Sequence, residues 1–158
     1  MPDTILSEAE VERIINLPKR ITEHNQWREG DDGSWYMEVP IEAEEQLPLR
    51  LYGRFNPRTA NYTFILFCGR LNLRRLDVGK RHHNPECDDV GSPHKHRWTD
   101  RFRDKWAYEP PEMENKSSIC DTFTTFLAEC NIALEGRFAE PPQVYHPAHF
   151  AGYQGRLI

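Results

Sequence analysis

The chain has 158 residues, a mass of 18.6 kDa and a net charge of −5, which suits one domain and excludes two of ordinary size. Hydrophobic residues make up 38% and 18 side chains are aromatic, so the chain is not disordered throughout. The longest strongly apolar run, 64–68, is too short for a membrane helix, and the acidic start MPDTILSEAEVE does not resemble a secretory signal. We therefore expect one cytoplasmic domain over 1–158, with no membrane partner.

The first 33 residues are expected to form a short helix and a linker. Ser7 and Glu10 make a capping box at the start of the helix, and Pro18 ends it. The following residues are mostly polar and finish in an Asp-Asp-Gly turn, which is typical of a linker.

Four strands are predicted in the middle of the chain from the spacing of apolar residues. They span 35–41, 47–55, 62–68 and 71–78. The third is apolar on both faces, which indicates the central strand of a sheet. In the fourth, the apolar phase changes between Leu73 and Leu76, which predicts a β-bulge or a bend where the strand leaves the core.

A longer helix is predicted near the carboxyl end. Ser118 and Asp121 form a second capping box, and the helix is expected to reach 134–136. Its apolar stripe consists of Ile119, Phe123, Phe126, Leu127 and Cys130. Residues 137–158 contain three prolines and are expected to form an irregular arm. The element order predicts an α+β fold, a four-stranded, mainly antiparallel sheet with both helices packed on one face.

Positive charge and histidines are concentrated in one segment. Residues 70–105 carry ten Lys or Arg against six Asp or Glu, whereas the rest of the chain carries ten against nineteen. Four of the seven histidines also lie there: His82, His83, His94 and His96. Asn-Pro and Ser-Pro turn signals separate the two pairs, so the pairs could face each other across a hairpin-like excursion. The alternative is a solvated basic loop.

One functional interpretation is binding or cleavage of nucleic acid or of another phosphate-bearing ligand, with no cofactor. Facing histidines can act as general base and general acid, which makes His83, His94 and His96 the candidate catalytic residues. Cations hold phosphates and aromatic rings stack on unpaired bases. The candidate ligand-binding residues are Arg74, Arg75, Lys80, Arg81, Arg97, Trp98 and Arg101.

Two alternatives remain open. The first is a metal site for zinc or another divalent ion, because an HxH pair with a neighbouring histidine pair and a thiol supplies the ligands that zinc prefers. Its ligands would be His82, His83, His94, His96 and Cys87. The second is a non-catalytic protein interaction module. The four cysteines form no CxxC pair, so we expect them to be reduced.

The runs LNLRRLDVGKRHHNP and GSPHKHRWTDRF, followed by a helix ending near FLAECNI, resemble a group of small uncharacterised bacterial proteins with a paired-histidine segment. The resemblance covers residues 45–135. It implies a prokaryotic or mobile-element source, but no activity for the histidines. Whether the protein is an enzyme is left open by the sequence.

Overall fold

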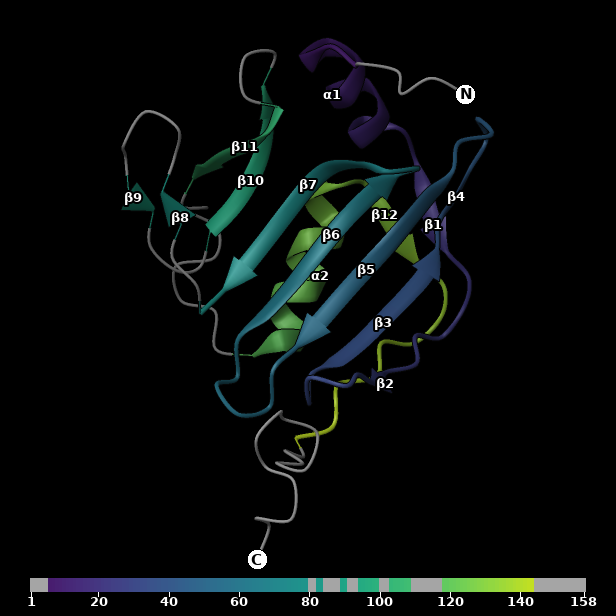
Figure 1. Cartoon of the computed structure of the whole chain (residues 1–158). Helices are drawn as coiled ribbons and strands as arrows, with labels where there is room; N and C mark the ends of the chain where they lie inside the picture. Colours follow the sequence, from purple (N-terminus) through teal and green to yellow (C-terminus); the bar gives the residue numbers. More distant parts are fainter. Residues whose placement is uncertain are drawn as a thin grey trace, which may run out of the picture.

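A computed structural model describes the backbone of residues 6–79, 82–83, 89–90, 94–99, 103–108 and 118–143, and the side chains of 6–79 and 118–143. Within these residues the chain forms an α+β fold with two helices (Figure 1). The helices are α1 (Glu8–Asn16) and α2 (Ile119–Glu129). The strands are β1 (Lys19–Ile21), β2 (Arg28–Glu29), β3 (Trp35–Pro40), β4 (Glu42–Ala43), β5 (Leu49–Phe55), β6 (Tyr62–Cys68), β7 (Leu71–Val78), β8 (His82–His83), β9 (Asp89–Val90), β10 (His94–Thr99), β11 (Arg103–Tyr108) and β12 (Ile132–Leu134).

The large sheet has the order β11-β10-β7-β6-β5-β3-β2, and every neighbouring pair is antiparallel. The four predicted strands are present as β3, β5, β6 and β7, with β6 in the interior as predicted. The sheet is larger than predicted because β2 extends one side and β10 and β11 extend the other. The polar sequence of β10, HKHRWT, lacks the apolar alternation that marks a strand, so its pairing with β7 was not predicted.

A small sheet of order β12-β1-β4 lies beside the large one. Strand β1 falls in the segment that was expected to be a linker, and it pairs with β12 in parallel and with β4 in antiparallel orientation. The predicted end of the second helix at 134–136 is wrong. Helix α2 ends at Glu129, Asn131 turns the chain with a left-handed φ of 56°, and the next three residues form β12.

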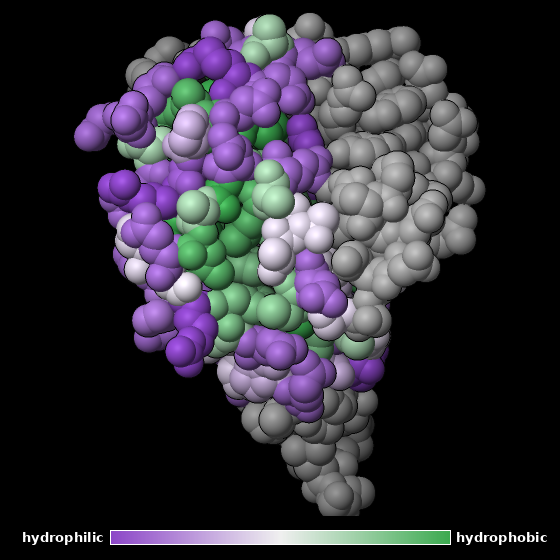
Figure 2. All heavy atoms as spheres, turned by 180° about the vertical axis from the view of Figure 1, so that it is seen from behind, coloured by the Kyte–Doolittle hydropathy of each residue, from purple (hydrophilic) through white to green (hydrophobic). Residues whose placement is uncertain are grey.

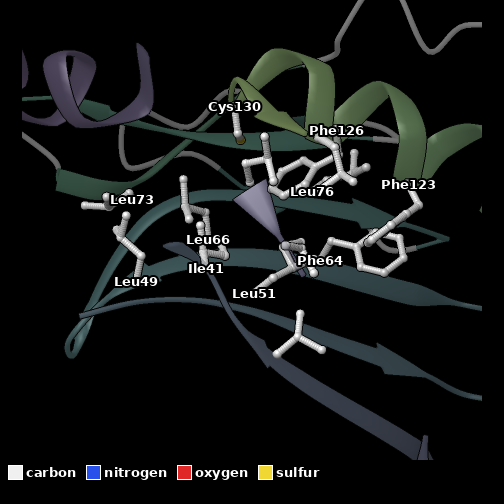
Figure 3. Packing of buried hydrophobic residues seen from close by; sticks show 14 of the residues in the cluster. Ile41, Leu49, Leu51, Phe64, Leu66, Leu73, Leu76, Phe123, Phe126 and Cys130 are labelled. Carbon is white, nitrogen blue, oxygen red and sulfur yellow. The ribbon is translucent and has the colours of Figure 1, made fainter. Parts of the chain in front are cut away.

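Buried residues of both helices and of one face of the large sheet form one hydrophobic core (Figure 3). Ser118 caps α2 by accepting a hydrogen bond from the amide of Asp121, and every residue of the predicted stripe is buried. The Phe123 ring packs against Phe64 of β6, with ring centroids 5.0 Å apart. Phe138 stacks on the same Phe123 ring at 4.1 Å, so the start of the predicted arm belongs to the core. We call this side of the sheet the helix-covered face.

The predicted bulge in β7 is confirmed. Leu66 of β6 lies opposite Arg74, but the next residue of β6 lies opposite Asn72, so Leu73 is the additional residue. The bulge allows Leu73 and Leu76 both to be fully buried despite their odd spacing. Neither α1 nor α2 has the length and apolar content of a membrane-spanning helix.

Candidate functional site on the helix-free face

The other face of the large sheet carries neither described helix and points toward the viewer in Figure 1. We call it the helix-free face. Successive residues of a strand point to opposite faces, so the residues of this face alternate with those of the core. They are Tyr36, Glu38, Arg50, Tyr52, Arg54, Thr63, Ile65, Phe67, Arg75 and Asp77.

Strand register arranges this face in two rows that run across five strands, from β3 to β10. Residues directly opposite each other in an antiparallel pair lie on the same face. The first row is Tyr36, Arg54, Thr63, Asp77 and His94, and the second is Glu38, Tyr52, Ile65, Arg75 and His96. Two of the predicted catalytic histidines therefore occupy register positions at the ends of these rows.

Three half-buried aromatic rings form a chain across the helix-free face. The ring centroids of Tyr36 and Tyr52 are 6.2 Å apart, and those of Tyr52 and Phe67 are 6.1 Å apart. Two guanidinium groups accompany the rings: Arg50 lies 4.1 Å from the centroid of Phe67, and Arg54 lies 5.7 Å from that of Tyr36. These contacts hold planar apolar surfaces and cations side by side.

Carboxylates balance the arginines at the exposed edge of this face. Glu38 accepts a hydrogen bond of 2.6 Å from Arg50, and Asp32 accepts one of 3.1 Å from Arg54 and one of 2.7 Å from the Tyr36 hydroxyl. Although burial alone would raise it, the pKa of Asp32 is lowered by these hydrogen bonds and by one from the Ser34 amide. Burial raises the pKa of Tyr52, so its phenol stays neutral. Exposed ion pairs of this kind contribute little to the stability of the fold.

A buried polar group lies at the centre of the first row. The Asp77 side chain is only 2% exposed and accepts hydrogen bonds from the Thr63 hydroxyl at 2.5 Å and from Nε of Arg75 at 2.8 Å. A carboxylate removed from water needs such donors, since desolvation of an unpaired charge is costly. The two donors come from β6 and β7, so the group ties these strands together.

The two adjacent arginines of β7 lie on opposite faces. Arg75 belongs to the helix-free face, whereas Arg74 is buried on the helix-covered face, where it pairs with Glu129 of α2 and, at 2.9 Å, with Glu12 of α1. This geometry argues against the prediction that Arg74 binds a ligand, because two protein carboxylates already hold its guanidinium group.

The histidine-rich segment is placed only in its backbone. His82 pairs with Val90 and His83 with Asp89 in a separate two-stranded sheet, so β8 has β9 rather than β10 as its partner. The other predicted residues of β10 are Arg97 and Trp98. Convergence of the two histidine pairs lies outside the described residues. So do the side chains of His82, His83, His94, His96, Arg97 and Trp98, together with Lys80, Arg81, Cys87 and Arg101.

Among the residues with described side chains, no group of three or more His, Cys, Asp or Glu is arranged to hold a metal ion. The predicted metal ligands are outside that set, so the metal hypothesis stays a prediction. Among the described side chains, Cys68, Cys120 and Cys130 are free thiols.

A hollow of about 660 Å³ lies away from the helix-free face, between the end of α1 and the small sheet. Lys19 lines it, but its Nζ donates to the carbonyls of Ile14, Ile15 and Leu17 at 2.8, 2.5 and 2.7 Å and so caps α1. Burial lowers the pKa of Lys19 to about 8.

The back of the molecule, opposite the side seen in Figure 1, shows apolar residues at its centre with hydrophilic residues around them (Figure 2).

The aromatic residues Tyr36, Tyr52 and Phe67 were not predicted as part of a site. A signal was present, because Arg50, Tyr52 and Arg54 alternate with the apolar residues of the same strand. Asp77 and Thr63 gave no signal, since their proximity depends on the register between β6 and β7.

The chain belongs to a family of unknown function, DUF6978, which it matches over residues 6–132. The matched range includes the whole helix-free face and the histidine-rich segment. No curated protein and no solved structure matches the chain.

Proposed function

Starting from membership of a family whose function is unknown, we propose that the helix-free face binds single-stranded RNA. The observation that carries the proposal is the chain of Tyr36, Tyr52 and Phe67 rings with Arg50 and Arg54 beside them. Unpaired bases stack on aromatic side chains exposed on a sheet, at about 1–3 kcal/mol per base, and guanidinium groups bind the phosphates between them.

The register places the positions of His94 and His96 on the helix-free face, opposite Asp77 and Arg75, whereas Lys95 and Arg97 lie opposite Leu76 and Arg74 of the helix-covered face. Among the described side chains, the cations of the helix-free face are therefore Arg50, Arg54 and Arg75. The half-buried rings of Tyr36, Tyr52 and Phe67, with successive centroids 6.2 and 6.1 Å apart, offer room for about two or three bases.

The rings favour a single strand over a duplex. Bases of a duplex are stacked inside the helix and cannot stack on Tyr52 or Phe67, whereas bases of a single strand can. The arginine–carboxylate pairs at this face are exposed and contribute little to the stability of the fold.

The proposal is tested by fluorescence anisotropy with a labelled single-stranded RNA of mixed sequence, titrated at about 50 and 200 mM salt. Affinity should fall steeply with salt, since phosphate contacts release counterions. Tyr52→Ala should weaken binding by about 5- to 150-fold through loss of stacking. Arg54→Gln should weaken it and reduce the salt slope by about one.

Arg13→Gln is the matched control for Arg54→Gln. Arg13 is also a half-exposed arginine paired with carboxylates, Glu10 and Glu45, but it lies on α1 away from the helix-free face. It should change neither affinity nor salt slope. Equal effects of the two arginine substitutions, or no binding at low salt, would refute the proposal.

A further inference from the structure

Arg75 differs from the other two arginines of the helix-free face in the way it is held. Its Nε donates to Asp77 at 2.8 Å, and this carboxylate is only 2% exposed and also accepts a hydrogen bond from the Thr63 hydroxyl. The Arg75 side chain is itself 33% exposed. A buried carboxylate therefore fixes one edge of a guanidinium group that still reaches the surface.

The terminal nitrogens of Arg75, Nη1 and Nη2, have no hydrogen-bond partner among the residues that the structure describes. Arg50, by contrast, donates through both of its terminal nitrogens, to the Glu38 carboxylate at 2.6 Å and to the carbonyl of Gly69 at 3.4 Å. Arg54 donates to Asp32 through Nη2. Arg75 is thus the arginine of this face that keeps both terminal nitrogens for a ligand.

Tyr52 lies in the same row as Arg75, with Ile65 between them. Ile65 is 7% exposed and forms an apolar floor between two half-exposed side chains. Strands β5 and β7 are two strand spacings apart, about 10 Å, and a tyrosine and an arginine are long enough to approach each other across this distance. Within residues 6–79 and 118–143, the Tyr52 hydroxyl has no hydrogen-bond partner.

The electrostatics of Tyr52 agree with this placement. Burial raises the pKa of Tyr52 and the neighbouring Tyr36 raises it further, whereas the positive charges of Arg54 and Arg75 lower it. The Arg75 guanidinium group is therefore near enough for its charge to act on the phenol. Because the net shift is upward, the phenol stays neutral and its O–H can donate to an anion.

We propose that Arg75 and Tyr52 form a phosphate clamp, which holds one phosphate of the RNA backbone above Ile65. This inference rests on the proposed binding of single-stranded RNA. The planar fork of Arg75 donates from Nη1 and Nη2 to two non-bridging oxygens, and the Tyr52 hydroxyl donates to one of them. The rings of Tyr36 and Phe67 lie on either side of Tyr52, at 6.2 and 6.1 Å, so bases that flank this phosphate have a ring to stack on.

Without a clamp, Arg75 would only join β7 to Asp77, and the Tyr52 hydroxyl would only be hydrated. The two cases differ in what the phenolic oxygen contributes to binding. Tyr52→Phe removes this oxygen and keeps the ring, so stacking is preserved. The hydroxyl has no described partner, so its removal leaves no group of the fold unpaired.

The hydroxyl is tested by fluorescence anisotropy of Tyr52→Phe with the labelled single-stranded RNA. Loss of a hydrogen bond to a charged oxygen should weaken binding by about 10-fold or more. Tyr62→Phe is the matched control, because the Tyr62 hydroxyl donates to Thr122 of α2 at 2.8 Å, on the helix-covered face. The control should leave the affinity for RNA unchanged.

The fork is tested with Arg75→Lys, which keeps the positive charge near Asp77 but cannot donate from two coplanar nitrogens. It should weaken binding by about 10-fold without changing the salt slope, whereas Arg75→Gln should also reduce the slope by about one. Thermal unfolding shows which variants are folded. If Arg75→Gln fails to fold, Arg75→Lys and Tyr52→Phe still decide the question.

A shared phosphate makes the two substitutions interdependent. The double variant Tyr52→Phe/Arg75→Lys should lose less affinity than the product of the two single losses, because each residue depends on the same phosphate. Losses that simply multiply would assign the two side chains to separate contacts and overturn the clamp.

Wild-type affinity in Tyr52→Phe or in folded Arg75→Lys would also overturn the clamp. If Tyr52→Ala weakens binding in the same experiment, the proposed function stands without it, since the ring is then the part of Tyr52 that binds. RNA that is not bound by the wild type at low salt would overturn both.

Discussion

The two faces of the large sheet are built from the same strands but obey different rules. On β5, Leu49, Leu51 and Phe55 point into the core and are almost fully buried, whereas Arg50 and Tyr52, between them, are half-exposed on the other side. The helix-covered face is closed by apolar packing, and the helix-free face is held by pairs of charges and by ring contacts. The difference teaches that one strand can serve stability with one set of residues and surface chemistry with the next.

Arg74 and Arg75 show that neighbouring residues of the same type can be assigned to different faces of the sheet. They are neighbours of the same type, and only strand geometry sends one between the helices and the other to the helix-free face. The bulge at Leu73 fixes that phase, since uninterrupted pairing after Asn72 would place Arg74 opposite Ile65 and Arg75 opposite Phe64, and so exchange the two side chains between the faces.

The largest expected effect is on stability, and it compares the removal of one aromatic ring from each face of the sheet. Phe126 is fully buried on the helix-covered face, so Phe126→Ala should lower the free energy of unfolding by about 3–5 kcal/mol. Phe67→Ala on the helix-free face should cost about 1 kcal/mol, because that half-buried ring contacts Tyr52 and Arg50 instead of filling the core. Urea denaturation of both variants measures the difference. Similar losses would mean that the two faces are equally important to stability.

A smaller effect distinguishes the arginines of the two faces. Arg74→Met leaves the carboxylates of Glu12 and Glu129 without their cation beside the core, and should cost about 3 kcal/mol. Arg50→Met removes an exposed pair with Glu38 and should cost no more than about 1 kcal/mol. Both substitutions keep a long side chain, so thermal unfolding compares the charges. A larger loss for Arg50→Met would reverse our assignment.

The smallest effect concerns acid stability. The pKa of Asp32 is lower in the folded protein than in the unfolded chain, so its ionised form stabilises the fold above the unfolded value of about 4, and this contribution is lost as pH falls through the folded value. Asp32→Asn should therefore reduce stability by less than about 1 kcal/mol at neutral pH, and its difference from the wild type should shrink below pH 4.

Asp31→Asn, at the exposed neighbouring residue, is the control for the stability measurements at acidic pH. The free energy of unfolding is measured at a series of pH values from about 3 to 7. The two asparagine variants should differ in stability at neutral pH only. A constant difference across this range would show that the effect of Asp32→Asn comes from something other than its ionisation.

The helix-covered face could be predicted from the sequence, and parts of the architecture could not. Apolar alternation and the two capping boxes identify four strands and both helices because burial imposes a period on the sequence. Strand β12 could not be found this way, since its three residues follow α2 without a proline and gain their structure from pairing with β1. The polar β10 is held by its neighbours rather than by its own pattern.

Among the described side chains of the helix-free face, only Arg75 was predicted from the sequence as a candidate site residue. Local spacing singled out His94 and His96, and these positions do reach one face of the sheet. It could not supply Asp77 or Thr63, because their meeting depends on register across two strands, nor separate Arg74 from Arg75, because that depends on the bulge. Features that arise from pairing between strands are not visible in a one-dimensional pattern.

The parallel pairing of β1 with β12 has a consequence for the order of folding. The side-chain amide of Asn131 donates to the carbonyl of Asn16, 115 positions earlier, and the side-chain amide of Asn25 donates to the carbonyl of Ala139, 114 positions later. Closing loops of this length carries an entropy cost before any contact is gained, which slows folding. The hairpins β5–β6 and β6–β7 need only short loops, so we expect them to form early, and the seam between β1 and β12 to close last (Figure 1).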